Sequence, residues 1–394
     1  MSESYEKTRS GEKLLDLLSL TMGLLSAQRT IRMLSTAVFF GLGLVLLVLG
    51  ANSLVRGASN LAFSFGISPL VVGLTVVAFG TSAPEIAVSV GAALEGTTDI
   101  AVGNVVGSNI FNVLFILGVS ALIAPLIVNL QLIRQEVPIM IGASVLLLLL
   151  SLDGLLSWTD GAILVVLMVA YTSFLVIQSR SENKAGNTEF DVENQPAKPG
   201  AWDSRLPAQL GLIALGLLLL VVGSDWLVAS AVEFAKVMGV SDVVIALTIV
   251  SAGTSLPEVA TSVAAALKGE RDIAVGNVVG SSVFNVFACL GLASLVAIPA
   301  GLQVAPSLLA FDMWVMVAVA FACLPIFLTG REIARWEGGV FLAYYVAYVI
   351  YLVLDAQGHD ALGLYSSAML SFVVPITVIT LVVSGLRGKS RVSA

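Results

Sequence analysis

The chain has 394 residues, of which 58% are hydrophobic and only 11% are charged, and its mean hydropathy is +1.00. A soluble domain carries about 25% charged residues, so this composition excludes an ordinary soluble protein and indicates a membrane protein. The formal net charge of -7 comes without a basic stripe, which argues against nucleic acid as a partner.

Apolar runs of about 20 residues recur along most of the chain, and they are continuous rather than alternating. They predict an all-α integral membrane protein and not a β-barrel, with the lipid bilayer as a partner. The oligomeric state is left open. We expect eleven spans, near residues 36–55, 67–94, 99–126, 137–152, 159–178, 208–228, 240–267, 272–298, 309–328, 337–355 and 363–386.

One long hydrophilic connection, residues 179–207, is rich in charge, Asn, Pro and Gly, and predicts a mobile linker. It separates a first unit, 35–178, from a second unit, 208–355, and an extra span with a tail follows at 356–394. Basic residues favour a cytoplasmic linker and C-terminus, because only Lys236 then falls in an outer loop. We expect a multi-pass protein of the cell (inner) membrane.

The N-terminal tail, residues 1–34, disagrees with this orientation, because it carries five basic residues on the predicted outer side. Three explanations stay open. Residues 14–27 form a surface helix, the segment is a cleaved signal peptide, or translation begins at Met33. The mixture of acidic and basic residues disfavours the signal peptide.

An internal repeat organises the chain. Residues 73–124 align without gaps on 246–297 at a constant offset of 173, and 32 of the 52 pairs are identical. The two copies begin on the second and seventh spans, an odd number of spans apart, so they cross the membrane in opposite directions. Inverted repeats of this kind are typical of secondary transporters, whose sites lie near the bilayer midplane on broken helices. This arrangement favours a transporter over an enzyme.

Each repeat carries a polar motif inside an apolar span, "GTSAPE" at 80–85 and "GTSLPE" at 253–258. A charged Glu85 or Glu258 at the bilayer centre costs about 2.5–3.5 kcal/mol, so each needs a cation, a proton or a partner. The proline of each motif loosens the helix and frees the carbonyl one turn upstream. The motifs therefore predict a cation site on two broken helices. The alternative is a pair of protonated glutamic acids that only join helices.

Other polar residues of the repeats add neutral oxygen atoms, and ligation by oxygen alone suits Na⁺ or Ca²⁺. A single Ser or Asn is otherwise an interhelical hydrogen-bond donor. Asn104 and Asn277 are expected to brace the broken helices. The glycines of the two G-x-x-x-G patterns are expected at close helix contacts and not as ligands; they are Gly103, Gly107, Gly276 and Gly280.

The doubled motif, followed in each repeat by "GNVVGS" and "FN", resembles the alpha repeats of the cation/calcium exchanger superfamily, and in particular its bacterial sodium/calcium antiporters. The resemblance implies two inverted halves of five helices around central ion sites, with spans 1 and 6 sliding, and it leaves the eleventh span outside this core. It also implies the ligands, which are the carboxylates of Glu85 and Glu258, the hydroxyls of Thr81, Ser82, Thr254, Ser255, Ser108 and Ser281, the amides of Asn112 and Asn285, and the carbonyls of Ala78 and Ser251. Some relatives have aspartate where Asn285 stands.

The resemblance implies an antiporter that exchanges Ca²⁺ for Na⁺ by alternating access, without a cofactor. A proton- or potassium-coupled antiporter of the same fold is the alternative. A passive cation channel is disfavoured, because channels usually build their pore around an oligomer axis. An intramembrane hydrolase lacks support, because no histidine lies beside the serines within the spans.

Overall fold

The computed structural model describes residues 2–184, 203, 205–239 and 251–380. The first repeat contains α1 (Ser2–Phe65), α2 (Pro69–Val72), η1 (Gly73–Val77), α3 (Ala78–Thr81), α4 (Ala83–Glu95), α5 (Thr98–Phe111), η2 (Asn112–Leu117), α6 (Gly118–Ile123), β1 (Leu126–Ile127), η3 (Leu132–Glu136), α7 (Val137–Leu150), β2 (Leu155–Leu156) and α8 (Trp158–Lys184). Here η denotes a π-helical segment, whose turns are wider than those of an α-helix.

The second repeat contains α9 (Leu206–Val237), α11 (Ser251–Gly253), α12 (Leu256–Leu267), α13 (Arg271–Phe284), η6 (Asn285–Leu290), α14 (Gly291–Val296), β3 (Leu302–Gln303), η7 (Leu308–Asp312), α15 (Met313–Leu328), β4 (Glu332–Ile333) and α16 (Arg335–Ala356). The extra C-terminal span, Ala361–Thr380, adds α17 (Ala361–Ala368) and η8 (Met369–Val373).

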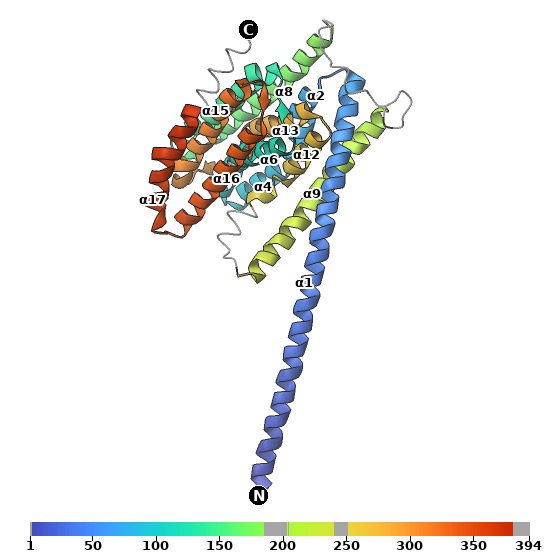
Figure 1. The fold of residues 1–394 in the computed structure, drawn as a ribbon, viewed down its shortest axis with the longest axis vertical. Coiled ribbons are helices and arrows are strands. Elements are labelled where there is room, and N and C mark those ends of the chain that lie inside the picture. The colour runs from blue at the N-terminus through green and yellow to red at the C-terminus, as the bar shows by residue number, and fades with distance from the viewer. Residues whose placement is uncertain (1, 185–202, 204, 240–250, 381–394) are drawn as a thin grey trace.

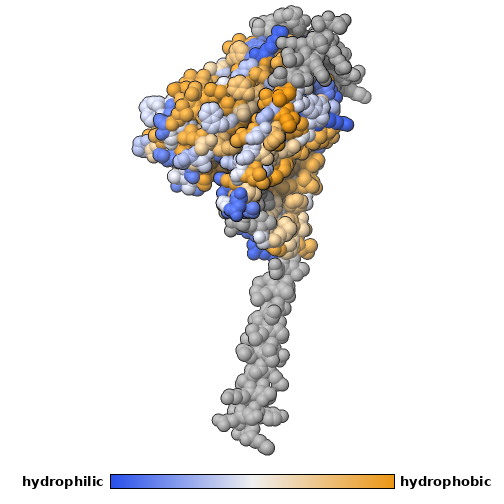
Figure 2. Space-filling view, turned by 60° about the vertical axis from the view of Figure 1, so that its left-hand side comes forward, coloured by the Kyte–Doolittle hydropathy of each residue, from blue (hydrophilic) through white to orange (hydrophobic). Residues whose placement is uncertain are grey.

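Nine helices in the described part of the chain are long and apolar enough to cross a membrane, and the number rises to ten when a bent pair counts as one span. This confirms the expected multi-pass, all-α architecture. The first half of the expected seventh span lies in 240–250, outside the described residues. Figure 2 shows hydrophobic residues over much of the visible face of the body, as a surface against lipid acyl chains requires.

Two boundaries differ from the expectation. The first span was expected at 36–55, but α1 is one continuous helix over Ser2–Phe65, and its apolar portion covers Arg32–Phe65. Helix α8 continues to Lys184, so the first residues of the predicted linker are helical. Most of that linker lies outside the described residues, and so does the tail beyond residue 380.

The second span is broken where the sequence predicted a weak point. Pro69–Thr81 and Ala83–Glu95 meet at a bend of 43°. Ser82 leaves the helical conformation there (φ -78°, ψ 3°), and its repeat counterpart Ser255 does the same (φ -89°, ψ 8°). Proline two residues after each serine has no N–H to donate, so the carbonyl four residues before it, that of Gly80 or Gly253, loses its usual helical donor.

Helix α13 crosses the broken span at close range. A Cβ atom on Gly276 would lie 3.0 Å from the carbonyl oxygen of Leu70, and one on Gly280 would lie 2.7 Å from that of Leu74. The expected close packing is therefore confirmed for the second glycine pair. For the first pair, Gly103 and Gly107, the residues equivalent to Leu70 and Leu74 lie within 240–250, outside the described residues. Close packing at these two glycines therefore stays a prediction.

Helices α1 and α9 lie side by side on one flank of the bundle (Figure 1). Glycines at equivalent repeat positions let the two backbones touch. A Cβ on Gly43 would meet the carbonyl oxygen of Gly223 at 2.8 Å, and one on Gly50 would meet that of Gly216 at the same distance. The pair is therefore packed backbone against backbone over several turns.

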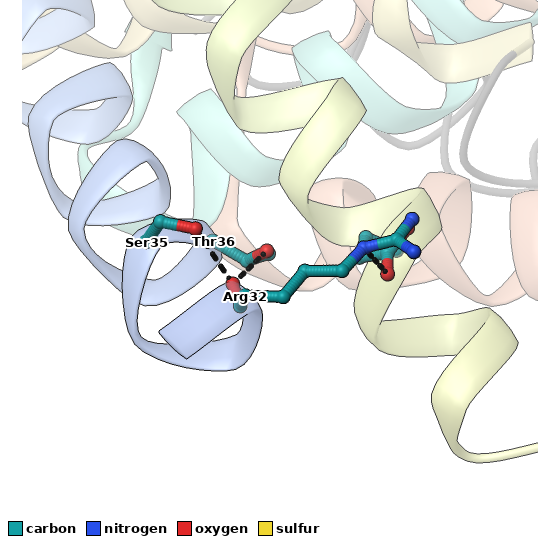
Figure 3. A network of polar contacts seen from close by, with 4 residues as sticks. Arg32, Ser35 and Thr36 are labelled. Atoms are coloured by element: carbon teal, nitrogen blue, oxygen red, sulfur yellow. Dashed lines mark hydrogen bonds and ion pairs between the residues drawn. The ribbon is translucent and has the colours of Figure 1, made fainter. Parts of the chain in front are cut away.

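Two ion pairs also connect α1 to the second half of the molecule. One lies on α9 itself, and the other lies just before α9 begins. Figure 3 shows the Arg32 side chain reaching from α1 toward α9, where its guanidinium meets Glu233 at 2.8 Å. Arg56 pairs with Asp203 at 2.6 Å, just before α9 begins. Together with the glycine contacts, these pairs hold α1 and α9 as one unit.

Four two-residue strands were not expected. Strand β1 pairs antiparallel with β4, and β2 pairs antiparallel with β3, so each small sheet joins a loop of the first repeat to a loop of the second. A strand of two residues is too short to produce a periodic pattern in the sequence.

Candidate ion-binding site

Glu85 and Glu258 both lie in the first turn of a helix, α4 and α12, and both are fully buried. A helix N-terminus carries partial positive charge and favours a carboxylate. Each glutamate accepts a hydrogen bond from the serine of the opposite repeat. Ser255 Oγ lies 2.8 Å from Glu85 Oε1, and Ser82 Oγ lies 3.4 Å from Glu258 Oε1. Because each serine stands three residues before the other glutamate, the two carboxylates converge.

The second oxygen of each carboxylate has no hydrogen-bond partner in the described part of the chain. Neither glutamate takes part in an ion pair within the described residues, where the two salt bridges are those of Arg32 and Arg56. An uncompensated charge in this position is expensive. The arrangement therefore offers two free carboxylate oxygens to a cation.

Hydroxyl groups surround the carboxylates on both sides. Thr81 Oγ1 lies 3.4 Å from Ser281 Oγ, and both hydroxyls are within 3.4 Å of the carbonyl oxygen of Ala78. On the other side, Ser255 Oγ lies 3.2 Å from Ser108 Oγ. The structure thus places the predicted hydroxyls in two groups, one beside each glutamate, and the Ala78 carbonyl belongs to the group with Thr81 and Ser281. Ser251, the counterpart of Ala78, begins α11 directly after the undescribed residues 240–250.

Asn104 and Asn277 brace the broken helices as predicted. Asn277 Nδ2 donates to Ser262 Oγ at 2.9 Å and to the Glu258 carbonyl at 3.4 Å. Asn104 makes the equivalent bonds to Ser89 Oγ at 3.1 Å and to the Glu85 carbonyl at 3.4 Å.

The amide oxygens of these two asparagines serve the opposite repeat. Thr81 donates to Asn277 Oδ1 at 3.0 Å, and Thr254 donates to Asn104 Oδ1 at 3.4 Å. Sequence reasoning missed the supporting serines, Ser89 and Ser262, although they are identical residues at the repeat offset of 173.

The predicted amide ligands are not equivalent. Asn112 and Asn285 each begin a π-helical segment and each is fully buried. Neither side-chain atom of Asn112 has a partner among the described residues, whereas Asn285 is hydrogen-bonded at both ends of its amide. In the part of the chain that the structure describes, Asn112 is therefore the amide with no partner at either end, whereas the oxygen of Asn285 meets only the Cys289 thiol, at 3.6 Å. Within the described residues no three His, Cys, Asp or Glu side chains gather as a metal site, so any cation here relies on hydroxyl, amide and carbonyl oxygens beside two carboxylates.

The sequence analysis also did not identify two further buried acids, each of which accepts a hydrogen bond from a tyrosine. Tyr171 donates to Glu136 Oε2 at 2.9 Å, and Tyr348 donates to Asp312 Oδ1 at 2.7 Å. The pairs occupy corresponding places in the two halves, at the start of α7 and α15. Glu136 also accepts bonds from Gln131 and Gln135. Its hydrogen-bonding capacity is met by protein groups, which distinguishes it from Glu85 and Glu258.

Comparison with known proteins agrees with this geometry. The family model described as "Sodium/calcium exchanger protein" matches residues 35–177 and 208–354. The putative antiporter CaxA of Alkalimonas amylolytica is 39% identical over 321 residues, covering 80% of this chain and 98% of CaxA. The sodium/calcium exchanger MaX1 of Methanosarcina acetivorans is 35% identical over 340 residues, covering 79% of this chain and 96% of MaX1. The inner membrane protein YrbG of Escherichia coli is 38% identical over 292 residues, covering 74% of this chain and 89% of YrbG.

Solved structures of the sodium-calcium exchanger NCX_Mj share the fold, with a TM-score of 0.68, 31% identity, and coverage of 80% of this chain and 98% of NCX_Mj. That exchanger was studied after soaking with Na⁺ and Ca²⁺. The two matched halves, the inverted repeats and the convergent acid pair agree in one assignment. The chain is a transporter, a cation antiporter that belongs to the sodium/calcium exchanger family.

Proposed function

We propose that this antiporter exchanges Ca²⁺ for Na⁺ across the cell (inner) membrane by alternating access at the site between Glu85 and Glu258. The observation that carries the proposal is the pair of fully buried carboxylate oxygens without a partner among the described residues. Two such charges are stable in a membrane interior only when cations or protons balance them. One Ca²⁺ or two Na⁺ balance both charges, so the two ions compete for the same oxygens.

The remaining donors support these ions over softer metals. Ca²⁺ takes six to eight oxygen ligands from carboxylates, carbonyls, amides and hydroxyl groups. Hydroxyls of Thr81, Ser82, Ser108, Ser255 and Ser281 and the Ala78 carbonyl lie in the hydrogen-bonded groups beside the two glutamates. The predicted amide ligand Asn112 is buried, and its oxygen has no partner among the described residues.

The test is calcium uptake into proteoliposomes under an outward Na⁺ gradient, comparing the wild type with Glu85→Gln. The amide keeps the shape and the contact with Ser255 but removes one negative charge. We expect uptake to fall to background while the protein stays folded. Glu95→Gln is the matched control, because Glu95 is an exposed acid at the end of the same helix. Uptake at the wild-type rate by Glu85→Gln would show that the site is assigned wrongly.

One observation makes the proton a second candidate for the coupling ion. No basic side chain in the described ranges pairs with either glutamate, so a proton balances each charge as simply as Na⁺ does. Replacing the Na⁺ gradient by a pH gradient, and in a separate arm by a K⁺ gradient, distinguishes the three. Sodium coupling predicts uptake only in the Na⁺ arm. Uptake driven by the pH gradient without Na⁺ would assign the coupling to protons.

A further inference from the structure

The two asparagines that begin the π-helical segments occupy the same place in the repeat but have different surroundings. Asn285 Nδ2 donates to Asn109 Oδ1 at 3.0 Å, and Asn285 Oδ1 accepts a weak bond from the Cys289 thiol at 3.6 Å. Both atoms of the Asn112 amide lack a partner in the described part of the chain. The repeat sequence alone, with Asn at both positions, does not distinguish them.

The difference originates at one position. Asn109 lies in "GSNIFN", and the residue at the repeat offset is Ser282 in "GSSVFN". Asn109 is 3% exposed, and its own Nδ2 donates to the Ser282 carbonyl at 3.1 Å. Because that donation fixes which end of the Asn109 amide is the oxygen, Asn109 can only accept from Asn285. Ser282 instead bonds within its own helix, to the Val278 carbonyl, so Asn112 has no equivalent partner.

This chain of bonds decides which end of the Asn285 amide remains available. An amide binds a cation through its oxygen, and an NH₂ group that faces a cation repels it. Asn109 occupies the NH₂ end of Asn285, which leaves the oxygen as the available end. The thiol of Cys289 is only a weak donor, so it does not compete strongly for that oxygen.

We propose that Asn109 is a positioning residue of the ion site, which holds the Asn285 amide with its oxygen available to the transported cation. This rests on the proposed function of the site, because it assumes that the cation binds among these residues. The site then has one amide with a fixed orientation, Asn285, and one that turns to meet the ion, Asn112. Asn109 acts through Asn285 and does not itself need to touch the ion.

The experiment compares Asn109→Ser and Asn109→Leu with the wild type in proteoliposomes. Serine is the residue of the other repeat, and leucine keeps the branched shape of asparagine, in a larger side chain without polar atoms. Both remove the amide acceptor. Partners one step behind a metal ligand typically change metal affinity by about ten- to a hundredfold. We expect the KM for Ca²⁺ to rise about tenfold, with a much smaller change in kcat.

Two controls separate positioning from a general loss of structure. Ser282→Ala removes the side chain at the symmetric position but keeps its carbonyl, so it should leave KM unchanged. In an Asn285→Ala background, no amide is left to orient, so Asn109→Ser should add no further rise in KM. An additive effect in that background would overturn the proposal.

The remaining outcomes also decide the matter. A wild-type KM in either folded Asn109 variant contradicts the proposal, and so does failure of both variants to fold, because the contact would then serve the fold. If the wild-type protein showed no Ca²⁺ exchange, the proposed function would be refuted instead. Failure of the proposed function and failure of the positioning role of Asn109 are therefore distinguishable.

Discussion

The bracing role of Asn277 gives the sharpest prediction for the broken helices. Its amide makes three contacts, with Ser262 at 2.9 Å, the Glu258 carbonyl at 3.4 Å and Thr81 at 3.0 Å, and it is fully buried. Hydrogen bonds inside membrane proteins contribute about 0.6 kcal/mol each on average, and buried ones in soluble proteins contribute about 1 kcal/mol. Asn277→Ala should therefore lower the free energy of unfolding by about 2–3 kcal/mol.

Asn104→Ala is the matched comparison, because Asn104 makes the equivalent contacts in the other repeat. Two of them are longer than in Asn277, since the Thr254 bond is 3.4 Å rather than 3.0 Å and the Ser89 bond is 3.1 Å rather than 2.9 Å. Asn104 is also only half-buried, so water replaces its bonds more easily. We expect a loss of about 1 kcal/mol for this variant. Denaturant titration in detergent, without added Ca²⁺, measures the free energy of unfolding of both variants. If Asn277→Ala lost no more of this free energy than Asn104→Ala, the reasoning would be refuted.

Two further predictions concern the α1–α9 unit. The hydrogen bond from Arg56 lowers the pKa of Asp203, so its stabilising contribution is present above the ordinary pKa of aspartate, about 4, and is lost as the pH falls through the lowered value. Asp203→Asn should flatten the fall in unfolding midpoint on acidification, and an unchanged pH profile would contradict this. Gly216→Ala should destabilise the protein by about 1–3 kcal/mol, because the added Cβ would lie 2.6 Å from the backbone nitrogen of Leu54. The control is Gly41→Ala, whose Cβ would meet no neighbouring atom of the described residues within 4 Å, so its thermal unfolding midpoint should equal that of the wild type.

Much of the site was predictable because its signals are local in the sequence. The proline and glycine of each motif mark the break, and an acid in an apolar span has few explanations. The odd number of spans between the copies then fixes their antiparallel arrangement. Those steps require only the identity of Glu85, Glu258 and their neighbours, and the structure brings the two glutamates together as expected.

The parts that escaped prediction depend on contacts between distant segments. Glu136 and Tyr171 are 35 residues apart, and Asp312 and Tyr348 are 36 apart. The constant offset of 173 no longer relates these pairs, because the connections after residue 124 differ in length between the halves. The unequal roles of the two asparagines also depend on a contact, since only the fold places Asn109 beside Asn285.

The two repeats share their sequence pattern but not their surroundings, and this difference bears on the mechanism. Thr261 of α12 is fully buried, whereas Val88, its counterpart on α4, is 39% exposed. Helix α1 packs against α12, and Lys268 at the end of α12 donates to the Asn52 carbonyl of α1 at 3.1 Å. The α1–α9 unit thus covers the helix that carries one glutamate more closely than the helix that carries the other. Because the halves are inverted copies, we expect a movement of that unit toward α4 to exchange the two environments without requiring new chemistry. An antiporter needs two such states of similar free energy, and a duplicated sequence around a shared acid pair is a direct way to obtain them.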